Sequence, residues 1–153
     1  HTYLGDISVG IPADWAGPRQ CETCLITATT PGYLNWTDNF LGSLWQNGEV
    51  RDASLVVFAG GMKSEQDRKR VADLCKKYNA EVVSFELGHR ENITSKLGAT
   101  IAPYLFDAKR YLALDGDMVV LRSLKPLLAA IDAMPETAIG CCREWNLSTS
   151  DNL

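Results

Sequence analysis

Four short apolar runs recur along the chain with helical segments between them, and this alternation constrains the fold most strongly. The runs are residues 24–28, 55–59, 81–85 and 111–114. The second run is apolar throughout and is closed by Gly60 and Gly61, as expected for a strand buried on both faces. Helices are predicted over residues 36–46, 64–78, 95–106 and 124–131, the last with Pro126 in its first turn. Residues 138–142 are predicted to form a further strand.

Strands that alternate with helices predict an α/β fold with a mostly parallel sheet flanked by helices. Ligands of such sheets bind outside the carboxyl ends of the strands. Functional residues are therefore expected just after Ala28, Ala59, Phe85 and Leu114. Residues 1–20 are rich in glycine and proline and are predicted to form an irregular lead-in, with residues 21–153 forming one domain.

Length, net charge and the lack of a long apolar run indicate which classes of protein this chain can belong to. The 153 residues suffice for one domain with a core of its own. A net charge of −4 argues against a broad electrostatic surface for nucleic acid. No apolar run approaches the roughly 20 residues that span a bilayer. Sequons at Asn35, Asn92 and Asn146 matter only in a secretory compartment, and such triplets arise easily by chance. We therefore expect a cytoplasmic protein, with the Golgi or another secretory lumen as the alternative.

The cysteines are predicted to be small apolar residues of the core. Cys21 and Cys24 form a C-x-x-C, but no second pair follows at zinc-ribbon spacing, and Cys141 and Cys142 are adjacent. A redox C-x-x-C opens a helix, whereas this one leads into a β-like run.

Two carboxylates follow the fourth apolar run. Asp115 and Asp117 flank Gly116, and a second apolar stretch, residues 118–121, comes next. In extended chain an i, i+2 spacing places both side chains on one side, and glycine lets the backbone bend and a ligand approach. Like charges this close need a cation beside them, and Mn²⁺ or Mg²⁺ binds through one or two carboxylates together with substrate phosphates. A metal and diphosphate site is therefore predicted here.

Residues 111–121, Tyr-Leu-Ala-Leu-Asp-Gly-Asp-Met-Val-Val-Leu, resemble the D-x-D segment of GT-A-fold glycosyltransferases. The likeness is greatest to glycosyltransferase family 8, which includes glycogenin and bacterial galactosyltransferases. Residues 25–30, Tyr33 and residues 41–44 are similar to that family's first strand, donor loop and first helix. Lys96 matches a basic residue that the family places before the acidic strand. The resemblance covers residues 24–142 and implies a Rossmann-like GT-A nucleotide-diphospho-sugar transferase fold.

The resemblance implies a role for each matched residue. Ala28, Thr29 and Thr30 would contact the uridine and ribose, and Tyr33 would border the uracil, with a plain loop anchor as its alternative role. Asp115 and Asp117 would bind Mn²⁺ or Mg²⁺, with Asp117 the more direct ligand and Asp115 or Gly116 also near the ribose. Lys96 would approach the sugar or the diphosphate, a role for which Arg90 competes. Lys96 and Asp117 are thus the candidate catalytic residues.

The family also has parts that this chain does not match. It takes a third metal ligand, a histidine, from well downstream, whereas His1 and His89 both precede the acidic pair. The acceptor-binding half is expected to be absent, so we expect these residues to bind a nucleotide sugar but to turn it over poorly by themselves.

The leading hypothesis is metal-dependent transfer of a sugar from a UDP-sugar to a hydroxyl acceptor, with retention at the anomeric carbon. The acceptor is a sugar, a protein or a lipid, and a homo-oligomer is possible. A nucleotidyltransferase that makes NDP-sugars is an alternative, but it calls for a Gly-rich basic loop after the first strand. A nucleotide-sugar-binding module without catalysis is another. A phosphoacceptor or haloacid-type fold would carry the acidic pair after its first strand, not its fourth.

Overall fold

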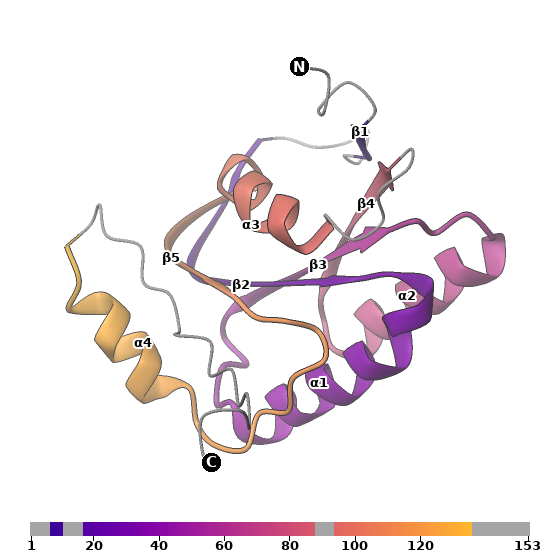
Figure 1. The fold of residues 1–153 in the computed structure, drawn as a ribbon. Helices are drawn as coiled ribbons and strands as arrows, with labels where there is room; N and C mark the ends of the chain where they lie inside the picture. The colour runs from indigo at the N-terminus through magenta and orange to yellow at the C-terminus, as the bar shows by residue number, and fades with distance from the viewer. Residues whose placement is uncertain (1–6, 11–16, 88–93, 136–153) are drawn as a thin grey trace, which may run out of the picture.

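A five-stranded sheet with helices on both faces forms the core of this computed structural model, which describes residues 7–10, 17–87 and 94–135 (Figure 1). The strands are β1 Ile7–Gly10, β2 Arg19–Thr29, β3 Ser54–Gly60, β4 Glu81–Leu87 and β5 Phe106–Ala113. The helices are α1 Leu34–Asn47, α2 Glu65–Lys77, α3 Thr94–Leu105 and α4 Lys125–Asp132, with a short 3₁₀ helix, η1, over Pro31–Tyr33. None of the described helices is long and apolar enough to cross a membrane.

The strand order is β1-β4-β3-β2-β5, with β4, β3, β2 and β5 parallel and β1 antiparallel to β4. The chain builds outward from β2 through β3 to β4, and then returns to place β5 on the opposite side of β2. The predicted mostly parallel α/β sheet is confirmed. The direction of building reverses between β2 and β5, and such a reversal leaves a crevice at the carboxyl ends of the two strands.

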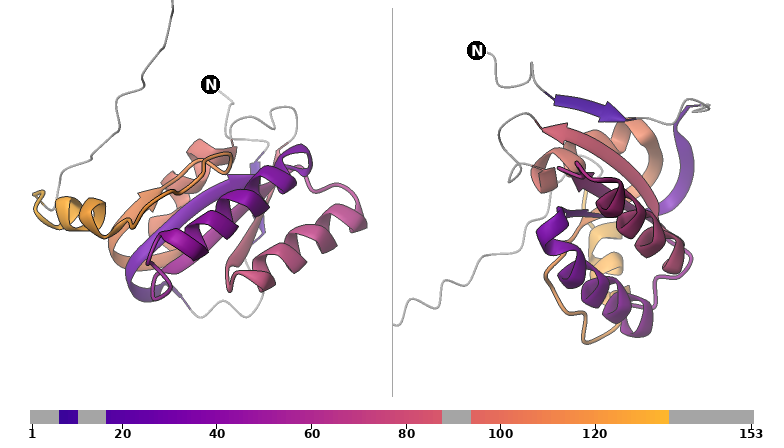
Figure 2. Two further views of the ribbon diagram at one scale, coloured as in Figure 1. Left: turned by 90° about the horizontal axis from the view of Figure 1, so that it is seen from below. Right: turned by 90° about the vertical axis from the view of Figure 1, so that its right-hand side faces the viewer.

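The alternation of side chains along β2 and β3 supplies a core on each face of the sheet. Leu25 and Val57 pack with α1 and α2 on one face, whereas Ile26 and Phe58 pack with α3 on the other. Figure 2 shows α1 and α2 side by side on the same side of the sheet. Because β2 and β3 are covered on both faces, their apolar runs are continuous, which is why the sequence pattern located them well.

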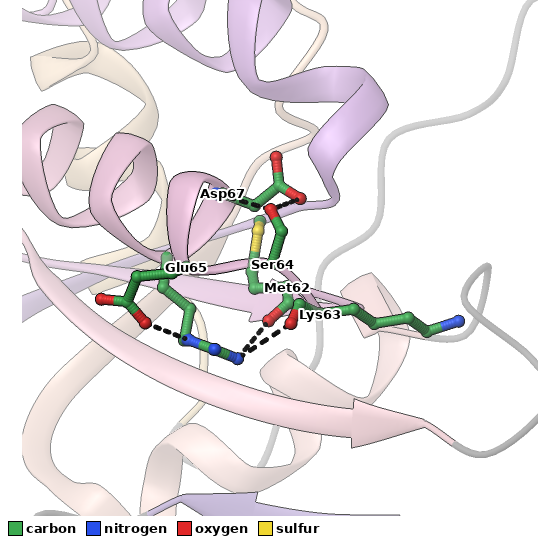
Figure 3. A network of polar contacts seen from close by, with 6 residues as sticks. Met62, Lys63, Ser64, Glu65 and Asp67 are labelled. Carbon is green, nitrogen blue, oxygen red and sulfur yellow. Dashed lines mark hydrogen bonds and ion pairs between the residues drawn. The ribbon is translucent and has the colours of Figure 1, made fainter.

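Helix α2 begins where the sequence predicted, at Ser64. The hydroxyl of Ser64 accepts a hydrogen bond from the backbone N–H of Asp67 at 3.0 Å, which caps the helix. Arg68 reaches back and donates to the carbonyl oxygens of Met62 and Lys63 at 3.1 and 3.2 Å (Figure 3). Arg68, Lys69 and Arg70 are exposed as expected, but Arg68 also fixes the loop that joins the carboxyl end of β3 to α2.

Polar contacts join α1 to the end of α2 and α4 to the sheet. Asp38 of α1 accepts hydrogen bonds from Lys77 Nζ at 2.8 Å and from Tyr78 Oη at 2.6 Å, and so joins α1 to the end of α2. Burial raises the pKa of Asp38, but these two hydrogen bonds outweigh it and hold the pKa below its usual value. Arg110 of β5 pairs with Asp132 and so holds α4 beside the sheet.

Three sequence-based predictions need correction. The irregular lead-in over residues 1–20 contains a strand, β1, which pairs with β4. Strand β2 begins at Arg19, not at Cys24, and β5 begins at Phe106, not at Tyr111. The early halves of β2 and β5 pair with each other from Arg19 opposite Phe106 onward, and such pairing with a distant segment leaves no apolar run in the sequence. Helix α3 ends at Leu105, and the strand expected over residues 138–142 lies outside the described residues.

The cysteines of the described region behave as predicted. Cys24 is buried in β2 and Cys75 is buried in α2, and burial raises the pKa of each thiol to about 12. Both thiols are therefore protonated at neutral pH and unreactive as nucleophiles. Cys21 is half-buried on the same strand as Cys24, not at a helix start. Cys141 and Cys142 lie outside the described residues.

We predict that Gly98→Ala destabilises the fold through the contact between α3 and β3. A Cβ at Gly98 would lie 2.7 Å from Cδ2 and 2.8 Å from Cγ of the fully buried Phe58. Overpacking costs roughly 1–3 kcal/mol and exceeds the gain of about 1 kcal/mol in helix propensity. Urea unfolding should show a lower free energy of unfolding. Gly32→Ala, which meets nothing within 4 Å, is the control and should change stability by less than about 0.5 kcal/mol.

Candidate functional site

The carboxyl ends of β2 and β5 meet at the reversal of strand order. The last pair between them is Ile26 opposite Ala113, and β2 continues for three residues to Thr29. Beyond the ladder, the N–H of Leu114 still donates to the carbonyl oxygen of Ile26 at 2.9 Å. The chain that leaves β5 is thereby directed along the projecting end of β2.

The acidic pair lies on a turn and not in extended chain. Strand β5 ends at Ala113, and Gly116 and Asp117 form a turn in which the N–H of Met118 approaches the carbonyl oxygen of Asp115 at 3.4 Å. The backbone bends at Gly116, as the glycine was expected to allow, so the two aspartates do not continue the extended strand. Both aspartates are exposed. Within the described part of the chain, no group of three or more acidic, histidine or cysteine side chains forms a metal cluster.

Gly116 lies against the end of β2. A Cβ at this position would lie 2.7 Å from the carbonyl oxygen of Ala28, 3.1 Å from Thr37 Oγ1 and 3.3 Å from Thr27 Oγ1. The first of these distances is too short for any side chain, since a backbone oxygen cannot move away cheaply. A glycine at position 116 therefore lets the acidic turn pack closely against the backbone of β2. The turn consequently lies beside Ala28, one of the residues predicted to contact the nucleotide.

Three buried threonines, two on β2 and one on α1, cluster near Gly116. Thr27, Thr29 and Thr37 are all at most 3% exposed. Thr37 Oγ1 lies within hydrogen-bond distance of Thr29 Oγ1, at 2.8 Å, and of the carbonyl oxygen of Tyr33, at 3.1 Å. Thr27 Oγ1 is the one buried side-chain oxygen among the described residues that lacks a hydrogen-bond partner. Sequence reasoning missed Thr27 and Thr37. For Thr27 the available signal was the pair of threonines at alternate positions of β2, whereas Thr37 lies on α1 and has no such signal.

The predicted nucleotide-contacting residues border the same edge of the sheet. Thr29 ends β2, Thr30 precedes η1, and the N–H of Tyr33 donates to the carbonyl oxygen of Thr30 at 2.9 Å. The Tyr33 ring is 54% exposed, so an aromatic face is available beside the strand end. Ala28 is half-buried and faces Gly116 through its carbonyl oxygen. The structure thus brings residues 28–33 together with the acidic turn.

Lys96 is only partly placed. It lies in the first turn of α3, the helix whose Gly98 packs against Phe58 of β3, but its side chain is outside the described part of the structure. Phe58 is two residues before the end of β3, so the beginning of α3 lies toward the carboxyl end of the sheet. Arg90, His89 and His1 fall outside the described residues.

The fold belongs to a recognisable class. An α/β sheet with four parallel strands flanked by helices resembles part of the GT-A glycosyltransferase fold. No protein-family model matches the chain, and no curated protein matches it. The S. aureus TarS structure, segment 1–349, is similar with a TM-score of 0.53 and 21% identity, over 72% of this chain and 32% of that one.

A second solved structure, the bifunctional glycosyltransferase WbbM, is similar at 15% identity and a TM-score of 0.45, over 78% of this chain and 22% of that one. The chain spans about a third or less of the length of these two structures. The likeness is one of fold, and it gives no specific support for family 8.

We predict that Thr27→Val stabilises the protein. The substitution keeps the shape of the side chain and removes a buried hydroxyl without a partner, and such groups cost about 1–3 kcal/mol. Thr37→Val is the matched control, since its equally buried hydroxyl contacts Thr29 and Tyr33; it should lower the free energy of unfolding by about 1 kcal/mol. Destabilisation of similar size by both substitutions would show that Thr27 has a partner.

A second prediction concerns Gly116→Ala. The added methyl group would force the acidic turn away from the carbonyl oxygen of Ala28, and we expect a loss of roughly 1–3 kcal/mol in the free energy of unfolding. Gly42→Ala provides the comparison, because its Cβ would meet only the terminal hydroxyl of Tyr78, at 3.2 Å. Equal stability of both variants in urea would contradict the close packing of the turn on β2.

Proposed function

We propose that this chain forms the donor-binding part of a glycosyltransferase that moves a sugar from a UDP-sugar to a hydroxyl acceptor with retention. The observation that carries the proposal is the contact of Gly116, which lies between two exposed aspartates, with the carbonyl oxygen of Ala28 at the end of β2. The exposed Tyr33 follows four residues after that strand end. The resemblance to the GT-A fold supports the same proposal.

The acidic turn fits a hard divalent cation. Asp115 and Asp117 are exposed carboxylates with neither a hydrogen bond nor an ion pair to the rest of the described chain. Mg²⁺ and Mn²⁺ characteristically take one or two protein carboxylates and complete their coordination with water and substrate phosphates. A pair, and not a cage of three or four acids, is what such a metal–diphosphate complex needs. Bound there, the metal supplies positive charge next to the departing diphosphate.

The neighbouring residues provide the rest of the nucleotide site in this proposal. The exposed ring of Tyr33 stacks on the uracil, while Ala28, Thr29 and Thr30 border the uridine and ribose at the end of β2. Asp115 and Gly116 pass close to the ribose, and Asp117 is the more direct ligand of the cation. Lys96, in the first turn of α3, approaches the sugar or the diphosphate and stabilises the negative charge that develops there.

The experiment is thermal unfolding with UDP in the presence and absence of Mn²⁺. We expect UDP to stabilise the folded chain only with the metal, by about 2.7 kcal/mol at 100-fold excess over the dissociation constant. Asp117→Asn should abolish this metal-dependent gain and leave the stability of the free protein unchanged or slightly higher, because it relieves like-charge repulsion. The matched control is Asp107→Asn, an exposed aspartate near the opposite end of β5.

Each alternative gives a different result in this experiment. Equal stabilisation by UDP in EDTA would exclude a bridging metal. Normal UDP affinity in Asp117→Asn, or unfolding of that variant, would remove Asp117 from the metal site. Release of UDP from UDP-glucose or UDP-galactose, assayed with the full-length protein and sugar acceptors, separates a transferase from a binding module, which would bind both donors without releasing UDP.

A further inference from the structure

The segment that follows the acidic turn runs along α1 and is fastened to it at Val120. The N–H of Val120 donates to Ser43 Oγ at 2.9 Å, and Asn47 Nδ2 donates to the carbonyl oxygen of Val120 at 2.7 Å. Ser43 Oγ in turn donates to the carbonyl oxygen of Phe40 at 2.8 Å, which orients its hydroxyl. Both backbone groups of Val120 are therefore held by side chains of one helix, and we call this pair of contacts the Val120 clamp.

Within residues 118–121, apolar packing holds the segment at Val120, whose side chain joins the core cluster that contains Leu41 and Leu44 of α1. Met118, Val119 and Leu121 are 44%, 62% and 78% exposed, and within the segment only Val120 is buried, at 7%. A strand of a sheet would hold such a segment through a ladder of backbone bonds, but residues 118–121 belong to no strand. The Val120 clamp and the burial of the Val120 side chain together fix the path of the chain directly after Asp117.

The clamp and the end of β5 bracket the acidic turn. On one side the N–H of Leu114 is fixed to the carbonyl oxygen of Ile26, and on the other Val120 is fixed to α1. Only five residues lie between these anchors, and they include both aspartates. Two carboxylates separated by one residue repel each other, so an unanchored turn would open. Restraint at both ends limits how far the turn can open.

We propose that Ser43 and Asn47 are positioning residues for the acidic turn: they set the geometry in which Asp115 and Asp117 bind a divalent cation with a nucleoside diphosphate. This inference rests on the proposed function. The sequence pattern predicts a helix over residues 36–46 and indicates no such role for either residue. Helix α1 ends at Asn47, whose side-chain amide donates to the carbonyl oxygen of Val120.

The test measures the affinity for Mn²⁺ in the presence of UDP, by the loss of the electron paramagnetic resonance signal of free Mn²⁺. We expect Asn47→Ala and Ser43→Ala each to weaken Mn²⁺ binding by about 10-fold or more, the range found for groups that orient metal ligands. Ser43→Thr keeps the hydroxyl and should restore most of the affinity. Ser123→Ala removes a surface hydrogen bond to Glu49 further along the same segment and should leave the affinity unchanged.

A general loss of stability is separated from positioning by Leu74→Ala, which removes a buried side chain of α2 and destabilises the core away from the proposed site. If Leu74→Ala weakens Mn²⁺ binding as much as Asn47→Ala, or if Ser43→Ala and Asn47→Ala bind Mn²⁺ with UDP as tightly as the wild type does, the positioning role is overturned while the proposed function stands. If the wild-type protein itself binds no Mn²⁺ with UDP, the proposed function fails and this inference fails with it.

Discussion

Strand β2 is the element on which the rest of the structure depends. It pairs with β3 through its second half and with β5 through most of its length, and its side chains contribute to the core on both faces of the sheet. Its last three residues extend beyond β5 and offer backbone and threonine side chains to the acidic turn. Since Gly116 packs directly on the carbonyl oxygen of Ala28, the position of the carboxylates follows from how far β2 extends.

The elements predicted correctly from the sequence are those with a local signal, such as a continuous apolar run or a helix cap. The continuous apolar run of β3 and the capped, striped helix α2 were located to within a residue or so, because burial on both faces and an N-cap serine leave local signals. Strand β1 and the first halves of β2 and β5 were missed. They are polar or short, and they are strands because a distant segment offers them backbone partners.

In the candidate site, too, residues with a local sequence signal were predicted, and features that depend on contacts between distant segments were not. Asp115, Gly116 and Asp117 were found because carboxylates after an apolar strand are conspicuous, and the region around Thr29 and Tyr33 followed from the family resemblance. A bend at Gly116 was anticipated from the glycine itself, but its packing on the carbonyl oxygen of Ala28 was not, because the two residues are distant in the sequence and the glycine has no left-handed φ. Ser43 and Asn47 were missed because their partner, Val120, is more than 70 residues away along the chain.

Helix α1 joins the stability of the core to the geometry of the site. Its apolar residues Phe40, Leu41 and Leu44 are buried in the core, while Thr37, Ser43 and Asn47 contact the strand end and the segment after the acidic turn. Gly116 approaches Thr37 and Val120 is held by Ser43 and Asn47, so the chain from the turn onward runs parallel to the helix. A shift of α1 along the sheet would move all three polar side chains together. The close packing that resists such a shift therefore also keeps the two carboxylates in place beside β2.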